Sequence, residues 1–348
     1  MTILVTGASG FIGSYIVQEG LDKGLEVWAG VRGSSSRGYL QDERIKFAQL
    51  DLSDPDILLR QLLQYKEEMG GKGWDYVVHA AGATKCLDEK DFYRTNTDGT
   101  RHLIDTLRTA GMAPKRFVFV SSLSIFGAIR ENPVRKPSKD NPWIYAPILL
   151  TDTPAPNTAY GKSKLKAEEY LQQQVDFPYT ILRPTGVYGP REKDYFMMAK
   201  SIKQHIDFAV GYQPQEITFV YMMDVVQAIY RCIESSAAEG KSYFLSDGEV
   251  YNSRRFSDLL QQNLGNPWVM HIKAPLWLLR IICCVSTRVS HITGKMNALN
   301  DDKFHILSQR NWQCDIEPAI RDFGYSPQWK LEEGVKSTIK WYKESGWI

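Results

Sequence analysis

Hydrophobic and polar positions form two alternating kinds of segment in the first half of the chain. Short apolar runs predict buried parallel strands at 3–5, 26–31, 47–50, 76–78, 116–120 and 179–183. Between them lie stretches with helical spacing, such as 11–23, where Ile12, Ile16 and Val17 share one face. Strands that alternate with helices predict an α/β fold with a doubly wound parallel sheet.

Three glycines follow the first strand at once, in the segment TGASGFIG at 6–13. A strand, a glycine turn and a helix start form the setting in which backbone N–H groups and the helix dipole bind a pyrophosphate. The spacing is GxxGxxG rather than GxGxxG, and a turn that uses glycine for its geometry alone is the alternative. We expect a dinucleotide here, bound by Gly7, Ser9, Gly10, Phe11 and Ile12.

The end of the second strand bears on the choice of dinucleotide. An NAD site usually places Asp or Glu there for the adenosine 2′-hydroxyl, whereas a basic residue accommodates the 2′-phosphate of NADP. This strand ends in Arg32, and no acid follows before Asp42. The sequence therefore favours NADP(H), with NAD(H) as the second choice and a merely solvated arginine as the alternative reading of Arg32.

Two further strand ends supply candidate cofactor contacts. The third strand runs into Asp51 and Leu52. Asp51 is placed to bond the adenine amine, although a lone Asp is more often a helix N-cap. The fourth strand is followed by small residues that let a flat cofactor lie close to the backbone; these are Ala80, Ala81 and Gly82.

The fifth strand leads to the candidate chemistry. It runs into a serine cluster that includes Ser122, and in open parallel sheets ligands bind beyond the carboxyl ends of the strands. Tyr160 and Lys164 are four residues apart on a predicted helix, so they share a face. A nearby ammonium favours the phenolate, so we expect Tyr160 to exchange a proton with an alcohol or carbonyl. Ser122 would hydrogen-bond the same substrate oxygen, and Lys164 would also bond the nicotinamide ribose.

Together these segments resemble extended short-chain dehydrogenase/reductases, in the broad NAD(P)-dependent epimerase/dehydratase family. The matching stretches are TGASGFIG at 6–13, DL at 51–52, HAAG at 79–82, NTDGT at 96–100, FVSS at 119–122, YGKSK at 160–164 and RPTGVYGP at 183–190. The resemblance implies a Rossmann fold and an NAD(P)-dependent enzyme. It adds Asn96 as the structural member of a catalytic tetrad, and it implies that Pro184 to Val187 line the nicotinamide.

The resemblance also implies how the chain is divided. Residues 1–185 and about 215–240 would form the NAD(P)-binding Rossmann domain, and 186–214 with 241–348 a smaller C-terminal substrate-binding domain. Helices near 92–110 and 160–175 usually form a dimer interface in this family, so a homodimer is expected. The proline-rich insertion between the fifth strand and Tyr160 is interpreted as a substrate-side loop or lid, with a surface excursion as the alternative.

Composition narrows the partners and the compartment. With 42 basic and 40 acidic residues, the net charge of +2 gives no reason to expect nucleic acid. The five cysteines show no CxxC spacing and no histidine partners at metal-ligand intervals, so we expect no metal and a reduced, cytoplasmic compartment. The first strand begins at residue 3, which leaves no room for a signal peptide.

The longest apolar stretch, 275–286, is interrupted by Arg280. It is shorter than the ~20 residues of a membrane span, so none is expected. The segment around it resembles the apolar segment of hydroxysteroid dehydrogenase-like members. As a helix it places Leu278, Ile282, Val285, Val289 and Ile292 on one face, interpreted as a packed amphipathic helix with a membrane-surface contact as the alternative.

Two reactions remain open. The protein either interconverts a secondary alcohol and a ketone on a small, apolar substrate, as hydroxysteroid dehydrogenases and dihydroflavonol reductases do, or it epimerises or dehydrates a nucleotide-linked sugar. Sugar-nucleotide epimerases of the family often carry Asn where this chain has Gly186, and Arg in the region of 211–224, which here has no basic residue.

We therefore expect the first reaction. Apolar residues of the C-terminal half would then wall the substrate pocket; they are Trp268, Leu276, Trp277 and Leu278. A cofactor-sensing regulator without activity is disfavoured, because such proteins tend to lose the tyrosine or the lysine.

Overall fold

The computed structural model describes residues 1–138, 142–294, 297 and 299–348. Its strands are β1 (Thr2–Thr6), β2 (Glu26–Val31), β3 (Lys46–Gln49), β4 (Tyr76–His79), β5 (Arg116–Val120), β6 (Tyr179–Pro184), β7 (Gly186–Tyr188), β8 (Ile206–Val210), β9 (Glu216–Ile217), β10 (Phe219–Tyr221), β11 (Lys241–Leu245), β12 (Tyr251–Asn252), β13 (Met270–Ala274) and β14 (Asn311–Trp312). Its α-helices are α1 (Phe11–Asp22), α2 (Pro55–Glu68), α3 (Glu89–Phe92), α4 (Gly99–Thr109), α5 (Ala159–Gln172), α6 (Asp194–Lys203), α7 (Met222–Glu234), α8 (Arg255–Asn263), α9 (Leu276–Thr293), α10 (Asp301–Ser308), α11 (Glu317–Phe323) and α12 (Leu331–Glu344). Shorter segments are the π-helical η1 (Tyr93–Asp98) and the 3₁₀ turns η2 (Leu123–Ile125) and η3 (Ser236–Ala238).

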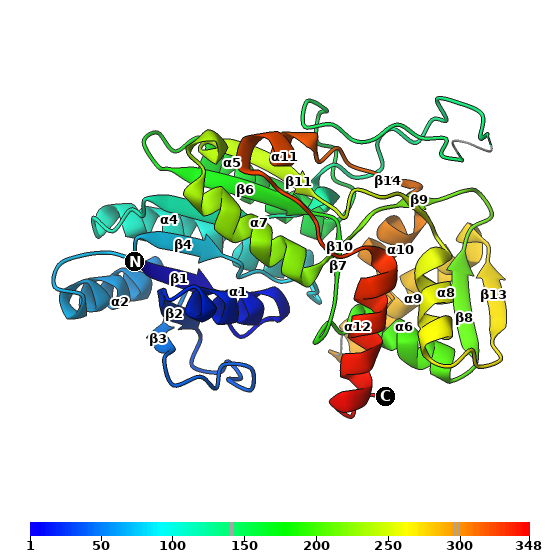
Figure 1. Ribbon diagram of the computed structural model, residues 1–348, viewed down its shortest axis with the longest axis horizontal. Helices are drawn as coiled ribbons and strands as arrows, with labels where there is room; N and C mark the ends of the chain where they lie inside the picture. Colours follow the sequence, from blue (N-terminus) through cyan, green and yellow to red (C-terminus); the bar gives the residue numbers. More distant parts are fainter. Residues whose placement is uncertain (139–141, 295–296, 298) are drawn as a thin grey trace.

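A seven-stranded sheet forms the larger part of the molecule (Figure 1). Its strand order is β11-β6-β5-β4-β1-β2-β3, and all its pairings are parallel. In β1, for example, Ile3 lies opposite Val27 on one side and Tyr76 on the other. Strands of such a sheet are apolar throughout because helices cover both faces. The structure thus confirms the predicted Rossmann-type, doubly wound α/β fold.

Successive side chains of each strand enter separate cores on the two faces of the sheet. Ile3 and Val5 pack with apolar residues of α1, α7 and α11, whereas Leu4 packs with those of α2, α4 and α5. Parallel pairing of β1 with β4 and of β4 with β5 places the carboxyl ends of these strands side by side, which is where the candidate site lies.

The smaller part of the molecule has its own aromatic core. Tyr188 is fully buried, and its ring lies 6.2 Å from that of Phe219 and 5.4 Å from that of Phe256. Side chains of α6, α8 and α12 complete this core, and β8 and β13 form a two-stranded sheet at its outer side (Figure 1).

The large sheet includes a strand beyond residue 240, where the sequence analysis ended the Rossmann part. Residues 241–245, assigned to the substrate-binding part, form β11, whose Tyr243 lies opposite Leu182 of β6. Ala319 and Phe323 of α11 also pack into a core of this sheet. The physical reason is that β6 would otherwise expose an unpaired, apolar edge. The division of the rest of the chain into two domains stays a prediction.

The proline-rich segment between η2 and α5 packs along β9 and β14. The backbone N–H groups of Ile144 and Tyr145 donate to the Glu216 carboxylate at 2.5 and 3.1 Å, and Ile148 N donates to Gln313 O at 3.0 Å. Residues 139–141 of this segment lie outside the described residues. Its interpretation as a lid stays a prediction.

Candidate active site

The glycine turn after β1 packs so tightly that side chains are excluded. Gly7 has φ +70°, and a Cβ there would lie 2.6 Å from Ala81 N. A Cβ on Gly13 would lie 2.1 Å from Gly7 O. Gly10 is the N-cap of α1 and provides no capping side chain, so the first N–H groups of this helix face outward from the turn. A turn of this shape is the kind that accommodates the diphosphate of a dinucleotide. The binding roles of Gly7, Ser9, Gly10, Phe11 and Ile12 stay a prediction.

The loop after β4 lies against this turn and against two buried polar side chains. Ala80 N donates to Thr6 O at 3.2 Å. A Cβ on Gly82 would lie 3.1 Å from both Asn96 Oδ1 and Lys164 Nζ. The structure thus brings together residues 80–82, Asn96 and Lys164, which are far apart in the sequence, at the carboxyl ends of the central strands.

Lys164 is almost fully buried and donates from Nζ to Val120 O at 3.0 Å. Burial lowers the pKa of its ammonium to about 8, although the charge of Glu168 acts in the opposite direction. Glu168 is itself engaged by Arg183, with Nη2 and Oε2 2.6 Å apart in a buried ion pair. Lys164 therefore holds a proton that it can release close to neutral pH.

Tyr160 lies in the first turn of α5, and Phe92 contacts its ring edge-on with centroids 6.3 Å apart. Burial raises the pKa of Tyr160 to about 12, and an interaction with the Ser122 hydroxyl acts against this rise. This direction is opposite to the one predicted from the sequence. The reason is that the Lys164 ammonium is bound at Val120 O, so burial dominates at the phenol.

Ser122 follows β5 and begins the turn η2. Its Oγ accepts from Ser124 N and donates to Ser124 Oγ, both at 3.1 Å. Together with its interaction with Tyr160, this places the two hydroxyls of the predicted site next to each other. An oxygen atom of a substrate held between them would be within reach of both.

Asn96 lies in the π-helical segment η1 and is fully buried. Its Oδ1 accepts from Ala83 N at 2.7 Å, and its Nδ2 donates to Ala83 O at 3.0 Å and to Ser163 Oγ at 2.9 Å. Such π-helical turns are frequent at functional sites. Asn96 thus ties the loop after β4 to the helix that carries Tyr160 and Lys164, an arrangement that suits a structural role.

His79 makes two hydrogen bonds inside the protein. Its Nδ1 lies 2.6 Å from Thr6 Oγ1, and its Nε2 lies 2.9 Å from Thr100 Oγ1. Burial lowers the pKa of the imidazole to about 3, with a further contribution from the Lys164 charge. His79 is therefore a neutral structural residue.

The residues predicted at the adenosine end lie close to one another. Arg32 is exposed, and its charge helps to lower the pKa of Asp51, for which hydrogen bonds from Ser53 are the larger cause. Asp51 Oδ1 accepts from Ser53 N at 3.0 Å, whereas the N-cap of α2 is Asp54. The alternative reading of Asp51 as the helix cap is therefore wrong. Leu52 follows directly, at the same end of β3.

The residues predicted to line the nicotinamide follow the end of β6. Pro184 is the last residue of β6 and lies opposite Leu245, and Val187 in β7 lies opposite Val220. Because β6 is the neighbour of β5, its carboxyl end lies on the same side of the sheet as Ser122.

Sequence reasoning missed Asp302, which comes from α10. Its carboxylate accepts hydrogen bonds from Ala159 N at 2.9 Å and Tyr160 N at 3.2 Å. Thr158 caps the same helix locally by accepting from Gly161 N at 2.9 Å. A threonine just before a helix is a recognisable signal, but no local pattern connects Asp302 with a helix more than 140 residues earlier.

Several groups occupy the substrate side. A Cβ on Gly186 would lie 2.6 Å from the Tyr195 hydroxyl, so this ring fills the space beside the glycine. Asp194 forms ion pairs with both Lys85 and Lys303, the latter at 3.1 Å. The two lysines thus share one carboxylate.

The apolar wall predicted for the substrate pocket is largely on the surface. Trp268 is 73% exposed and Trp277 is 65% exposed. Because they face water, neither forms an enclosed wall in this structure. Leu278 is also exposed, and Leu276 is half-buried.

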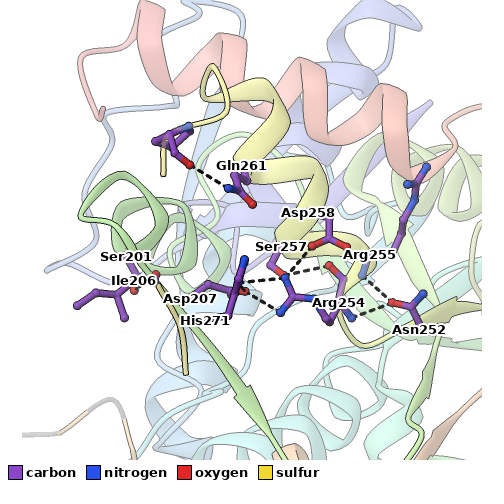
Figure 2. A network of polar contacts seen from close by, with 11 residues as sticks. Ser201, Ile206, Asp207, Asn252, Arg254, Arg255, Ser257, Asp258, Gln261 and His271 are labelled. Carbon is purple, nitrogen blue, oxygen red and sulfur yellow. Dashed lines mark hydrogen bonds and ion pairs between the residues drawn. The ribbon is translucent and has the colours of Figure 1, made fainter. Parts of the chain in front are cut away.

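A network of ion pairs holds β8, β13 and α8 together (Figure 2). The buried Asp207 lies 3.0 Å from His271 Nδ1 and 3.1 Å from Arg254 Nη1, and Arg254 Nη2 lies 2.9 Å from Asp258 Oδ1. Arg254 and His271 line a cavity of about 140 Å³. Since carboxylates already engage Arg254 on two sides, the network is structural.

Arg310 lies beside residues 211–224, a region that has no basic residue of its own. A Cβ on Gly211 would lie 2.2 Å from Arg310 Nη2, and this nitrogen is buried and has no hydrogen-bond partner in the described structure. Tertiary structure therefore brings a guanidinium to residues 211–224.

Two chemical features bear on cofactors other than a dinucleotide. Within residues 1–138, 142–294, 297 and 299–348, no group of three or more His, Cys, Asp or Glu side chains is placed to hold a metal ion. All five cysteines are free thiols.

Comparison with known proteins identifies the family of this chain. A model of the NAD-dependent epimerase/dehydratase family matches residues 3–252. The chain belongs to this family. It is therefore an NAD(P)-dependent enzyme, and it shares the Rossmann fold of the epimerase/dehydratase family.

Individual members of the epimerase/dehydratase family resemble the chain over nearly its whole length. UDP-glucose 4-epimerase of Vibrio cholerae is 25% identical, covering 97% of this chain and 94% of its own. The 3 beta-hydroxysteroid dehydrogenase/Delta 5-->4-isomerase of Monkeypox virus is 26% identical, covering 98% of each chain. The crystal structure of dTDP-glucose 4,6-dehydratase from Streptomyces venezuelae with NAD bound has a TM-score of 0.76 at 22% identity, covering 100% of this chain and 98% of that one. Because these relatives are named for different reactions, family membership establishes the class of enzyme rather than its substrate.

Proposed function

We propose that the protein transfers hydride between a nicotinamide cofactor and the carbon of a secondary alcohol or ketone on a small, apolar substrate. The observation that carries this proposal is the arrangement of Tyr160, Ser122 and Lys164 at the end of β5, beside Gly82. The dinucleotide, when bound, accepts or supplies the hydride.

The protein's own groups handle the proton and the developing charge. Tyr160 Oη exchanges a proton with the substrate oxygen, and Ser122 Oγ donates a hydrogen bond to the same oxygen. The Lys164 ammonium donates to Val120 O at 3.0 Å, and the interaction with Ser122 acts against the rise in the pKa of Tyr160 that burial causes. Asn96 keeps the loop at Ala83 in place against α5.

We also propose NADP(H) as the preferred cofactor, with NAD(H) as the second choice. The support is Arg32, an exposed guanidinium at the end of β2 and close to Asp51. Solved structures of relatives in the family contain NAD. The proposed preference for NADP(H) rests on Arg32 alone.

The apolar character of the substrate rests on what surrounds the site. Tyr195 fills the space beside Gly186, and Asp194 engages both Lys85 and Lys303. A substrate with two phosphate charges needs unpaired cations or helix N-termini. At these positions the described residues offer an aromatic ring and two lysines that Asp194 engages.

A second candidate function is epimerisation or dehydration of a nucleotide-linked sugar. Arg310 favours it, because its Nη2 is buried beside Gly211 and has no hydrogen-bond partner in the described structure. A guanidinium with a free donor is the group that a diphosphate would engage. UDP-glucose 4-epimerase is among the relatives in the family.

One pair of measurements separates the two candidates. With NADPH or NADH present, consumption of reduced cofactor is followed on a panel of apolar cyclic ketones, and UDP- and dTDP-sugars are titrated by calorimetry. We expect ketone reduction by the unmodified protein, turnover at least about 10²-fold lower in Tyr160→Phe, and weak binding of both nucleotides. Micromolar nucleotide-sugar binding that Arg310→Gln abolishes would replace the first function with the second.

Assembly and compartment are proposals as well. We propose a homodimer formed through η1, α4 and α5, whose surface includes the exposed ion pairs of Arg94 with Asp91 and of Arg101 with Asp98. We propose a cytoplasmic location on the support of five free thiols. Sedimentation of the full chain tests the dimer, and fractionation of cells that express it tests the compartment.

A further inference from the structure

Helix α9 carries its large apolar side chains on the outside of the protein. Its exposed members are Trp277, Leu278, Ile281, Ile282, Val285, Val289 and Ile292. The side facing the protein is narrow and includes Leu279, Cys283 and Ser290. The face interpreted from the sequence as packed is therefore exposed, because α9 meets α10 through its other side. An apolar patch of this kind on one helix marks an interaction surface.

The charged side chains that α9 itself carries are all basic. No Asp or Glu occurs from Leu259 to Asn300. Lys273, Arg280 and Arg288 are all exposed. Two acids from other segments contact α9: Asp301 N donates to Thr287 Oγ1 at 3.2 Å, and Asp88 lies 3.6 Å from His291 near the C-terminal end of the helix. The exposed face of α9 thus combines apolar side chains with cations.

We propose that the exposed face of α9 binds the surface of a membrane that contains anionic lipids. A helix with aliphatic side chains on one face, flanking cations and an aromatic residue near its start lies in the plane of the interface. Here Trp277 occupies the first turn, and Arg280 and Arg288 are both exposed, so that their guanidinium groups are open to lipid phosphates. The Arg280 guanidinium lies 5.7 Å from the ring centroid of Phe304 in α10.

The length of α9 also admits a membrane span. Among the described residues it is the one helix long and apolar enough to cross a membrane by length and composition, and 17% of it is buried. Arg280 and Arg288 within the helix make a span costly. The packing of Leu279 and Cys283 on the protein keeps one side of α9 out of the lipid. Both features favour a helix that lies on the surface.

A second copy of the chain fits this face less well than lipid does. Most homodimers have a twofold axis, which places a surface patch against the same patch of the partner. Such a pairing would bring the cations of α9 together without an acid on the helix to offset them. An anionic lipid surface supplies the missing negative charge.

The proposed membrane face adjoins the loop that follows β4. Thr287, Ser290 and His291 of α9 line a small cavity together with Cys86 and Leu87. α10 follows α9 in the chain and reaches the start of α5 through Asp302. A substrate that dissolves in lipid would therefore meet the protein beside its candidate site. The membrane proposal itself rests on α9 and not on the proposed reaction.

Flotation of the full chain with vesicles tests the proposal without any substrate. Vesicles of phosphatidylcholine alone are compared with vesicles that also contain phosphatidylglycerol, at low and at high salt. We expect binding to the anionic vesicles that weakens as salt rises. Failure to bind anionic vesicles at low salt would overturn the proposal.

Two pairs of variants locate the surface. Ile281→Gln with Val285→Gln, and separately Arg280→Gln with Arg288→Gln, should each weaken vesicle binding at least about tenfold. Matched changes on the exposed side of α2, Leu63→Gln and Arg60→Gln, should leave it unchanged. Equal loss in the α2 variants would contradict the proposal. So would a lipid-free dimer that Ile281→Gln with Val285→Gln converts to monomers, because a second copy would then cover this face.

Discussion

Asp302 in α10 accepts a hydrogen bond from the backbone of Tyr160 at 3.2 Å, and a second from Ala159 at 2.9 Å. A carboxylate at this position satisfies free N–H groups of the first turn of α5 and opposes the positive end of the helix dipole. The C-terminal half of the chain therefore holds the start of the helix that carries the candidate catalytic pair.

Removing this carboxylate should loosen the start of α5. We expect Asp302→Ala to lower the free energy of unfolding by about 1 kcal/mol, the usual cost of losing a helix cap. Turnover should also fall, because Tyr160 sits in the affected turn. Denaturant unfolding and steady-state kinetics measure the two effects, with Asp301→Ala as the neighbouring control. Equal behaviour of the two variants would show that the Asp302 contact contributes nothing.

Tyr160→Phe removes one hydroxyl from the proposed proton path. We expect turnover to fall by roughly 10²- to 10⁴-fold, the usual contribution of a general acid or base. Cofactor affinity should stay close to that of the unmodified protein. Kinetics and fluorescence titration of the cofactor check both, and Tyr170→Phe on the same helix is the control. Near-normal turnover in Tyr160→Phe would rule out the assigned role.

Lys164 should make stability depend on pH in the alkaline range. Burial lowers the pKa of its ammonium in the folded protein to about 8, below the ~10.4 of an unfolded chain. Between these values the unfolded state binds more protons, so this group makes stability rise with pH. The contribution is unfavourable below about pH 8 and has disappeared above ~10.4.

A pair of variants isolates that contribution. Urea unfolding is measured across this pH window for the unmodified protein, for Lys164→Met and for Lys162→Met, an exposed residue on the same helix. The rise should be absent in Lys164→Met and retained in Lys162→Met. If all three proteins gave the same pH dependence, Lys164 would not carry a lowered pKa.

Arg32 should decide between the two dinucleotides. A 2′-phosphate gains an ion pair with its guanidinium, whereas Asp at this position repels the phosphate and can accept from a 2′-hydroxyl. We expect the unmodified protein to bind NADPH more tightly than NADH, and Arg32→Asp to narrow or reverse the difference. Fluorescence titration with both cofactors measures it, with Arg37→Asp in the same loop as a comparison. Equal affinities in the unmodified protein would refute the assignment to NADP(H).

Local patterns in the sequence determined the fold class and much of the candidate site. The apolar runs gave the strands of the large sheet, because a strand buried on both faces needs apolar side chains throughout. The sequence also predicted the tight turn from the glycines at 7 and 13. Other backbone atoms lie so close to these two positions that there is no room for a Cβ. The sequence predicted that Tyr160 and Lys164 share one face of a helix, because residues four positions apart are neighbours on a helix surface.

Only the tertiary structure decided what surrounds these residues. Asp302 at the start of α5 and Arg310 beside Gly211 are brought to their places by chain segments about a hundred or more residues away. The direction of the Tyr160 pKa depends on burial and on where the Lys164 ammonium is bound, which spacing does not reveal. The outward face of α9 depends on which side α10 covers, because an amphipathic pattern defines a face without defining its partner.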